Sequence, residues 1–321
     1  MLTLDMIYQA RERISPYIIR TPLIRSQNLD RFLGCEAYLK LENMQNTVGV
    51  FKLRGALNKI LSCPMEELKN GVVAVSSGNH GKATAFVAKM LGIPATVVVP
   101  ETAPRIKIDA IKALGAAVVL TDTAERFRVG EKLAREKGVP LIPPFNDELI
   151  MAGQGTAGLE IAEQQPDLDA VIVPMSGGGL MAGVSAAIKS TASGIRLWGA
   201  EPAVLPRFRE SLKAGKAVNV GTAHTVADGL LTGIMGDKCF EVNAKTVDLV
   251  GDVTEEYILK GMKLLIMEGK ILGEASSAIT LGGVLQGVYP VEPGMKVCFF
   301  ISGGSVGLDQ LDQLKNVTYE S

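Results

Sequence analysis

One lysine and three glycine-rich loops are the parts of this sequence whose residue types could do chemistry. Lys52 stands among apolar residues, in the segment FKLRGA at 51–56. Apolar neighbours disfavour the charged form of an amine, and a neutral lysine is the nucleophile that forms a Schiff base with an aldehyde. A solvated lysine at the start of a helix explains the same segment, so the lysine alone leaves both interpretations open.

The glycine-rich loops each follow a predicted strand. They are SSGNHG at 76–81, SGGG at 176–179 and SGGS at 302–305. In open parallel sheets, ligands bind beyond the carboxyl ends of the strands, where free backbone N–H groups gather. A tight turn explains one such loop, but three in one chain indicate a ligand site. The small residues at 176–179 could wrap a phosphate, and a phosphate loop together with a reactive lysine suggests pyridoxal 5'-phosphate.

The loop at 176–179 also supports a different class of enzyme. Gly177, Gly179 and Ala182 match the G-x-G-x-x-A pattern of dinucleotide-binding folds loosely, and Glu201 follows at the end of the next predicted strand. A nicotinamide-dependent oxidoreductase is therefore an alternative, although it gives no role to Lys52 or to the other two loops.

The elements that must position these residues alternate between strands and helices. Strands are predicted at 72–75, 95–99, 116–120, 139–142, 170–173, 196–200 and 296–301, and helices at 82–91, 104–114, 125–137 and after 180. Strands and helices at this interval predict parallel βαβ units. We expect an α/β fold with two open, mostly parallel twisted sheets and flanking helices. A small substrate-closing domain, 71–146, would be inserted in a large cofactor-binding domain, 1–70 plus 147–321.

Composition excludes several classes of protein. The 321 residues include 47% hydrophobic and 21% charged residues, the balance of an α/β enzyme. Lys and Arg number 33 against 34 Asp and Glu, so no overall basic field exists to hold nucleic acid or an anionic membrane. No apolar run approaches the roughly 18–20 residues of a membrane helix, which predicts a cytoplasmic protein. With only His80 and His224, a histidine-rich metal centre is excluded.

Taken in order, the motifs resemble those of fold-type II pyridoxal-phosphate enzymes of the threonine/serine dehydratase and serine racemase family. The matching segments are TPL at 21–23, LKLEN at 39–43, FKLRGA at 51–56, SSGNHG at 76–81, AGQGT at 152–156, SGGGL at 176–180, ADG at 227–229 and SGG at 302–304. The resemblance implies a tryptophan-synthase-β-like fold and a homodimer. It also implies a small-molecule partner, a β-hydroxy amino acid such as L-threonine or L-serine, which is converted to a 2-oxo acid and ammonia. Serine racemase and 3-hydroxyaspartate ammonia-lyase are alternatives within the family.

The resemblance also implies roles for single residues. Lys52 matches the lysine that binds the cofactor covalently and removes the α-proton, and Phe51 matches the aromatic residue that packs against the cofactor ring. Asn79 matches the partner of the phenolic oxygen, and Ser302 the partner of the pyridine nitrogen. The implied phosphate loop comprises Ser176, Gly177, Gly178, Gly179 and Leu180. The implied loop for the substrate carboxylate comprises Ser76, Ser77, Gly78, Asn79 and His80.

Ser77 and Arg126 bear on the choice between activities. Ser77 matches the serine of racemases that delivers a proton to the far face of the α-carbon, and an ordinary loop serine explains it as well. Arg126 stands at a position that in serine racemases lies near the substrate, so it could bind a second carboxylate, as in 3-hydroxyaspartate. A solvated helix residue is the other interpretation of Arg126.

The sequence departs from the family pattern in three places. The segment TVGVFK at 47–52 is one residue longer than the usual loop before the lysine and lacks its serine hydroxyl. Ser305 stands where asparagine is usual. Glu201 matches one ligand of the family's divalent-cation site, but the acidic partner expected six residues later is Arg207. A divalent cation is therefore doubtful, and the guanidinium group could substitute for its charge.

Overall fold

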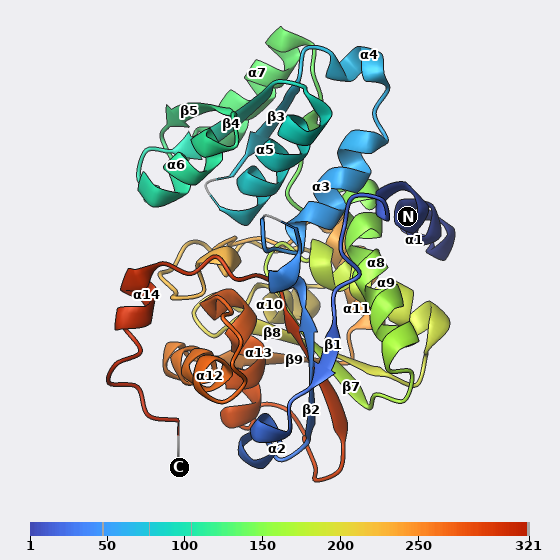
Figure 1. Cartoon of the computed structure of the whole chain (residues 1–321), viewed down its shortest axis with the longest axis vertical. Coiled ribbons are helices and arrows are strands. Elements are labelled where there is room, and N and C mark those ends of the chain that lie inside the picture. Colours follow the sequence, from blue (N-terminus) through green and yellow to red (C-terminus); the bar gives the residue numbers. More distant parts are fainter. Residues whose placement is uncertain (47, 77, 104, 320–321) are drawn as a thin grey trace.

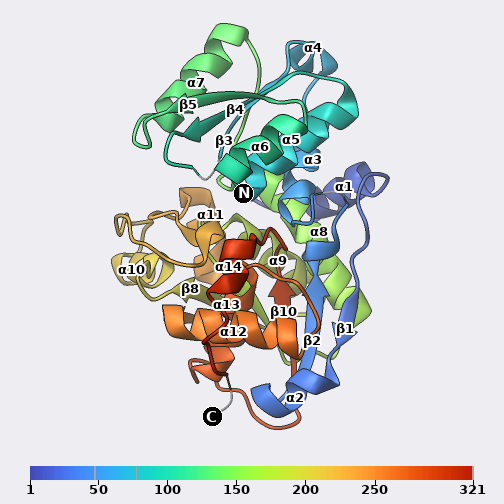
Figure 2. The same ribbon diagram turned by 60° about the vertical axis from the view of Figure 1, so that its left-hand side comes forward.

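The protein is described by a computed structural model that covers residues 1–46, 48–76, 78–103 and 105–319. Its strands form two sheets with helices packed around them, and the smaller sheet lies at the top of the molecule in Figures 1 and 2. The predicted α/β fold with two open, mostly parallel sheets is confirmed.

The smaller sheet is built from four parallel strands in the order β5-β4-β3-β6. These strands are β3 (Val72–Val75), β4 (Ala95–Pro100), β5 (Ala117–Thr121) and β6 (Leu141–Ile142). The helices between them are α5 (Asn79–Leu91), α6 (Arg105–Ala113) and α7 (Arg126–Lys137). Gly92 and Gly138 follow α5 and α7 with φ of 67° and 61°, the left-handed conformation that ends a helix at little cost for glycine.

The larger sheet has six strands in the order β1-β2-β10-β7-β8-β9, and only the β1–β2 pair is antiparallel. Its strands are β1 (Leu23–Arg25), β2 (Glu36–Leu41), β7 (Ala170–Pro174), β8 (Arg196–Pro202), β9 (Leu249–Val253) and β10 (Lys296–Ile301). Every residue of β7 is buried, as are five of the six in β10, because helices cover both faces of a parallel sheet.

The remaining helices cover the larger sheet or connect the two sheets. The longer ones are α1 (Leu4–Ile14), α2 (Gln27–Leu33), α3 (Lys52–Leu61), α8 (Glu148–Gln164), α9 (Gly179–Thr191), α10 (Arg207–Ala214), α11 (Asp237–Thr246), α12 (Glu255–Met267) and α13 (Ala275–Leu285). The short ones are η1 (Glu42–Met44), α4 (Met65–Leu68), η2 (Asp228–Leu230) and α14 (Leu308–Asp312). No helix among the described residues is both long enough and apolar enough to cross a bilayer.

The structure differs from the sequence expectations in a few elements. Helix α5 begins at Asn79 rather than at 82, and β6 covers two residues rather than four. The sequence analysis predicted neither strands β1, β2 and β9 nor the helices α1, α2, α8, α10, α11, α12 and α13. Strand β2 lacks an apolar pattern because it carries Lys40, which is fully buried beside Glu160. Because this ion pair allows a lysine to be buried, the strand lacks the continuous apolar run that would have predicted it.

Candidate active site

Three neighbouring strands of the larger sheet bring the predicted cofactor residues together. Strand β10 pairs in parallel with β2 on one side and with β7 on the other, so the carboxyl ends of all three lie at one edge. The segment that carries Lys52 follows β2, the loop 302–305 follows β10, and the loop 176–179 follows β7. Residues far apart in the sequence thus meet at one edge of the sheet, where ligands bind in such folds.

Backbone contacts fix the lysine segment against the loop that follows β10. The Phe51 N–H donates to the Ser302 carbonyl oxygen at 2.9 Å, and the Gly304 N–H donates to the Gly49 carbonyl oxygen at 3.0 Å. Val50 forms a β-bridge with Gly303 between these bonds. Lys52 therefore begins α3 at a position set by the chain around Ser302.

The amine of Lys52 lies in a desolvated place. Its Nζ donates to the Pro144 carbonyl oxygen at 2.6 Å and lies 5.1 Å from the centre of the Phe51 ring. Burial lowers the pKa of Lys52 to about 8, well below the usual 10.5, because the charged form loses its hydration. The side chain is therefore neutral at mildly alkaline pH, as a nucleophilic or proton-accepting amine must be.

The loop after β7 has the features of a phosphate site. The Ser176 hydroxyl oxygen is buried and has no hydrogen-bond partner among the described residues. Gly178 has φ of 90°, and α9 begins at Gly179 and continues with the buried Leu180, so the helix directs its free N–H groups and positive end at this loop. An unpaired hydroxyl at a helix N-terminus, near a desolvated lysine, fits pyridoxal phosphate.

Phe145 and helix α11 enclose this loop, and sequence reasoning did not identify them. A Cβ on Gly177 would lie 2.3 Å from the Phe145 ring, so only glycine fits there. Asn243 Nδ2 donates to the Gly178 carbonyl oxygen at 3.1 Å. Burial raises the pKa of the Cys239 thiol to about 12, which keeps this neighbour of Lys52 and Phe145 uncharged. An aromatic residue directly after Pro144 was the available signal in the sequence.

The Ser302 hydroxyl is held in a serine pair. Ser277 Oγ lies 3.1 Å from Ser302 Oγ, and it also accepts from the Gly303 N–H and donates to the Gly303 carbonyl oxygen, both at 2.9 Å. Ser302 is 3% exposed. A buried neutral hydroxyl at this edge fits the nitrogen of a pyridine ring and brings no negative charge to it.

The loop after β3 comes from the smaller sheet. The Gly78 N–H donates to Ser76 Oγ at 3.1 Å, while Ser77 lies outside the described residues. His80 Nε2 lies 2.8 Å from the Ile142 carbonyl oxygen, and burial lowers the pKa of His80 to about 3. The neutral ring therefore donates from Nε2 and orders the loop, and it carries no positive charge for a carboxylate.

Glu274 links the two sheets at the site, and the sequence analysis missed it. Its carboxylate accepts from Asn79 Nδ2 at 2.8 and 3.1 Å and from the Ser305 N–H at 3.1 Å. Burial, with a contribution from nearby Asp228, raises the pKa of Glu274 to about 7. A lone glutamate before a helix belongs to no motif, and the partners of Glu274 are distant in the sequence. The sequence alone therefore could not reveal its role.

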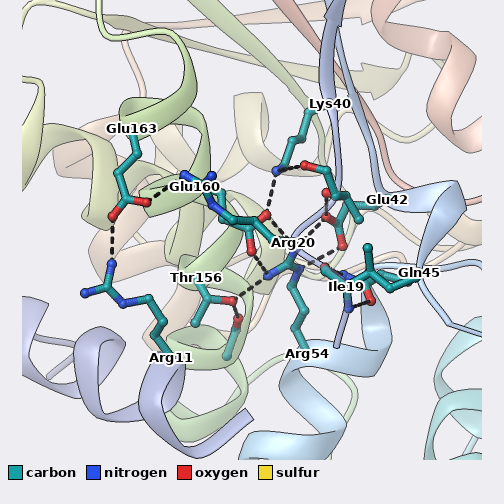
Figure 3. A network of polar contacts seen from close by, with 12 residues as sticks. Arg11, Ile19, Arg20, Lys40, Glu42, Gln45, Arg54, Thr156, Glu160 and Glu163 are labelled. Atoms are coloured by element: carbon teal, nitrogen blue, oxygen red, sulfur yellow. Dashed lines mark hydrogen bonds and ion pairs between the residues drawn. The ribbon is translucent and has the colours of Figure 1, made fainter. Parts of the chain in front are cut away.

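A buried ionic network supports the helix that begins with the lysine (Figure 3). Arg54, two residues after Lys52, donates to Glu42 at 2.8 Å, to Glu160 at 2.7 Å and to Thr156 at 3.0 Å. Lys40 donates to the same Glu160 at 2.6 Å. Because these groups come from β2, η1, α3 and α8, the network fixes α3 against elements that precede and follow it in the chain.

Two of the residues singled out in the sequence lie in other surroundings. Arg126 on α7 donates to the Thr123 carbonyl oxygen and lies 4.8 Å from the centre of the Phe127 ring, both in its own segment. Glu201 accepts from the N–H groups of Phe208 and Arg209 at 2.9 and 3.0 Å. Both carboxylate oxygens are engaged at the start of α10, which leaves the nicotinamide alternative without its ribose-binding carboxylate.

Comparisons with known proteins agree with this geometry. The family model described as "Pyridoxal-phosphate dependent enzyme" matches residues 14–303. L-threonine ammonia-lyase of Thermotoga maritima is 40% identical over 98% of this chain and 79% of its own length. L-threo-3-hydroxyaspartate ammonia-lyase of Saccharomyces cerevisiae is 36% identical over 94% of this chain and 93% of its own. The structure of maize serine racemase superposes with a TM-score of 0.92, at 37% identity over 97% of this chain and 96% of that one.

The predicted family is therefore confirmed, and the alternative of a nicotinamide-dependent oxidoreductase is wrong. The match extends over most of the chain and includes the lysine segment, the loops at 76–81 and 176–179, and the first two residues of the loop at 302–305. This chain belongs to the fold-type II family of pyridoxal-phosphate-dependent enzymes, together with threonine ammonia-lyases and serine racemases.

Proposed function

We propose that the protein is a pyridoxal-phosphate-dependent ammonia-lyase of β-hydroxy amino acids such as L-threonine or L-serine, which releases a 2-oxo acid and ammonia. The observation that carries the proposal is the desolvated amine of Lys52, whose pKa is lowered to about 8. Its segment is bound through the backbone to Ser302, at the sheet edge where the loop 176–179 also begins. Similarity to a threonine ammonia-lyase over 98% of the chain supports it.

Each predicted cofactor residue has a task that its surroundings suit. Lys52 would bind the aldehyde carbon, and Phe51 would pack against the ring. The phosphate would be held by the Ser176 hydroxyl and the N–H groups of 177–180 at the start of α9. Asn79 would donate to the phenolic oxygen, and Ser302 would face the pyridine nitrogen. Bound pyridoxal phosphate supplies a sink for the electrons that are released when a bond to the α-carbon breaks.

The hydroxyl that we assign to the pyridine nitrogen favours elimination over amino transfer. The Ser302 hydroxyl is neutral and paired with Ser277, so it does not keep a pyridine nitrogen protonated. A neutral Ser302 hydroxyl would leave bound pyridoxal phosphate a weaker electron sink, which would favour loss of the β-hydroxyl over amino transfer. Lys52, once its amine is free, accepts the α-proton at Nζ, which a lowered pKa permits near neutral pH.

The substrate carboxylate would be bound by the loop before α5. We assign to it Ser76, Ser77 and Gly78 of the loop together with Asn79 and His80, the first two residues of the helix. The helix begins at Asn79, so its free N–H groups and positive end favour an anion there. Neutral His80 supports this loop through Ile142 and supplies no charge.

The direct test is release of 2-oxo acid by the purified holoenzyme. L-threonine, L-serine and 3-hydroxyaspartate are compared by a coupled assay for the 2-oxo acid and a separate assay for ammonia. We expect both products in equal amounts from at least one of the first two substrates. Absence of 2-oxo acid from all three would refute the ammonia-lyase assignment.

Racemisation is a second candidate, because the fold of this chain closely matches that of maize serine racemase. We propose Ser77 as the group that donates a proton on the face opposite Lys52. The test measures D-serine formed from L-serine by the wild-type protein and by Ser77→Ala. No D-serine from the wild type, or equal amounts from both proteins, would refute this role.

We also propose that the 34.0 kDa chain works as a homodimer in the cytoplasm. Size-exclusion chromatography with light scattering measures the first property, and fractionation of the source cells measures the second. A monomeric mass for the active holoenzyme would contradict the dimer.

A further inference from the structure

Arg207 is a fully buried guanidinium group that no step of the proposed reaction uses. It is the first residue of α10, and its side chain is 0% exposed. Nη1 donates to the Met175 carbonyl oxygen at 2.8 Å, and Nη2 donates to the Leu230 carbonyl oxygen at 2.9 Å. The Glu201 carboxylate, also 0% exposed, is close enough that its charge raises the pKa of Arg207 against the effect of burial.

The oxygens around Arg207 are of the kind that hard cations select. Backbone carbonyl and carboxylate oxygens are the ligands that Ca²⁺ and Mg²⁺ take from proteins. Here the two carbonyl oxygens already accept from the guanidinium group, and the Glu201 oxygens accept from Phe208 N and Arg209 N. The described residues contain no group of three His, Cys, Asp or Glu side chains suited to a metal. The residues present therefore do not fit the divalent cation of the family's site near Glu201.

The partners of Arg207 connect it with the cofactor site. Met175 directly precedes the loop 176–179, and Leu230 ends η2. The same turn η2 carries Asp228, which pairs with Lys107 of α6 at 2.5 Å. One guanidinium group thus joins the start of the phosphate loop to the turn that contacts the smaller sheet's helices.

We propose that the Arg207 guanidinium takes the place of a divalent cation and positions the phosphate loop by holding the carbonyl oxygens of Met175 and Leu230. Arg207 is a positioning residue, since its guanidinium group donates to the carbonyl oxygens of Met175 and Leu230, which are not among the residues assigned to substrate or cofactor. The inference rests on the pyridoxal-phosphate site and is independent of which amino acid the enzyme converts, because its tests measure metal content, thermal midpoint and cofactor affinity.

The first test concerns metals bound to the wild-type protein. The holoenzyme is dialysed against EDTA, and its metal content and thermal midpoint are measured before and after, with and without added Ca²⁺ or Mg²⁺. We expect substoichiometric metal throughout and an unchanged midpoint. One equivalent of tightly bound metal, or a midpoint that EDTA lowers and Ca²⁺ or Mg²⁺ restores, would overturn the proposal.

The second test converts the surroundings of Arg207 into a site for a divalent cation. Arg207→Asp removes the guanidinium group and places a second carboxylate beside Glu201 and the two carbonyl oxygens. We expect Ca²⁺ or Mg²⁺ to raise the thermal midpoint of this variant by several degrees and to leave the wild type unchanged. The matched control is Arg209→Asp, two residues later, where the guanidinium is 42% exposed and pairs with Asp252 at 2.9 Å. An equal response of both variants to the cations would overturn the proposal.

A neutral variant tests positioning even if Arg207→Asp does not fold. Arg207→Gln keeps a hydrogen-bond donor but removes the charge and the simultaneous hydrogen bonds to the carbonyl oxygens of Met175 and Leu230. We expect its dissociation constant for pyridoxal phosphate, measured by absorbance titration of the apoprotein, to rise about tenfold. Arg209→Gln should change it less than about twofold. Wild-type cofactor affinity in Arg207→Gln would contradict the positioning role.

Discussion

At the scale of single residues, desolvation controls the chemistry of Lys52. Its pKa of about 8 predicts that uptake of pyridoxal phosphate by the apoprotein accelerates as pH rises toward 8 and then levels off. A lysine with the usual pKa of 10.5 would continue to gain rate well above pH 9. Stopped-flow absorbance between pH 6 and 10 measures the profile, and a rate still rising at pH 10 would contradict the lowered pKa.

Glu274 predicts a pH dependence of stability. Its folded-state pKa of about 7 lies above the usual 4.5, so between these values the folded protein holds a proton that the unfolded chain has lost. The contribution of Glu274 to the free energy of unfolding is therefore greatest below pH 4.5. It falls as the pH rises to 7 and then stays constant. The fall is at most about 1.4 kcal/mol per pH unit.

Glu274→Gln removes this titration and still offers an oxygen to Asn79 Nδ2. We expect the thermal midpoint of the variant, relative to wild type, to increase steadily from pH 5 to pH 7 and to stay level from 7 to 8.5. Glu201, whose pKa burial also raises to about 7, acts equally in both proteins and cancels in the comparison. A constant difference over the whole range would show that Glu274 does not titrate there.

At the scale of the elements, the ionic network of Arg54 determines where α3 places Lys52. Arg54→Met leaves the carboxylates of Glu42 and Glu160 buried with fewer partners, which is expected to lower the free energy of unfolding by about 3–5 kcal/mol. Arg20→Met is the control, because this guanidinium is 57% exposed and pairs with Glu163 at the surface. Its loss should lower stability by less than about 1 kcal/mol.

Urea denaturation followed by circular dichroism measures both variants. Equal loss of stability in Arg54→Met and Arg20→Met would contradict the special role of the buried network. A stable Arg54→Met protein with unchanged cofactor affinity would show that α3 needs no ionic anchor.

The elements also show what the sequence could predict. The smaller sheet was predictable because its strands, such as Val72–Val75, are continuous apolar runs, and glycines such as Gly92 mark the helix ends. Strand β2 was not predictable, because Lys40 interrupts its apolar pattern and the charge of Lys40 is balanced by Glu160 on a helix distant in sequence. Lys52 and the three loops could be identified because they form motifs. Glu274, by contrast, acts through a contact with Asn79, 195 positions away.

At the scale of the whole molecule, two contacts between polar side chains of the described residues join helices α5 and α6 of the smaller sheet's unit to the rest. Asn79 contacts Glu274, and Lys107 pairs with Asp228. We propose that residues 71–146 close on the substrate and that these contacts favour the closed arrangement. The side chains of Lys107 and Asp228 are 30% and 28% exposed, so their pair contributes about 1 kcal/mol or less.

Lys107→Met is therefore expected to raise KM for the amino acid by up to about fivefold, with little change in kcat or thermal midpoint. Lys132→Met is the matched control, since Lys132 pairs with Glu136 within α7 and faces solvent. Steady-state kinetics on both variants measures the effect. A lower kcat with unchanged KM in Lys107→Met would contradict a role in closure.

The central claim is that Lys52 carries the cofactor at the edge shared by β2, β10 and β7. Borohydride reduction of the purified holoenzyme, followed by proteolysis and mass spectrometry of the peptides, tests it most directly. We predict a single pyridoxyl modification, on Lys52, and none in Lys52→Ala. A pyridoxyl group on another lysine, or a wild-type protein that takes up no pyridoxal phosphate, would contradict the account.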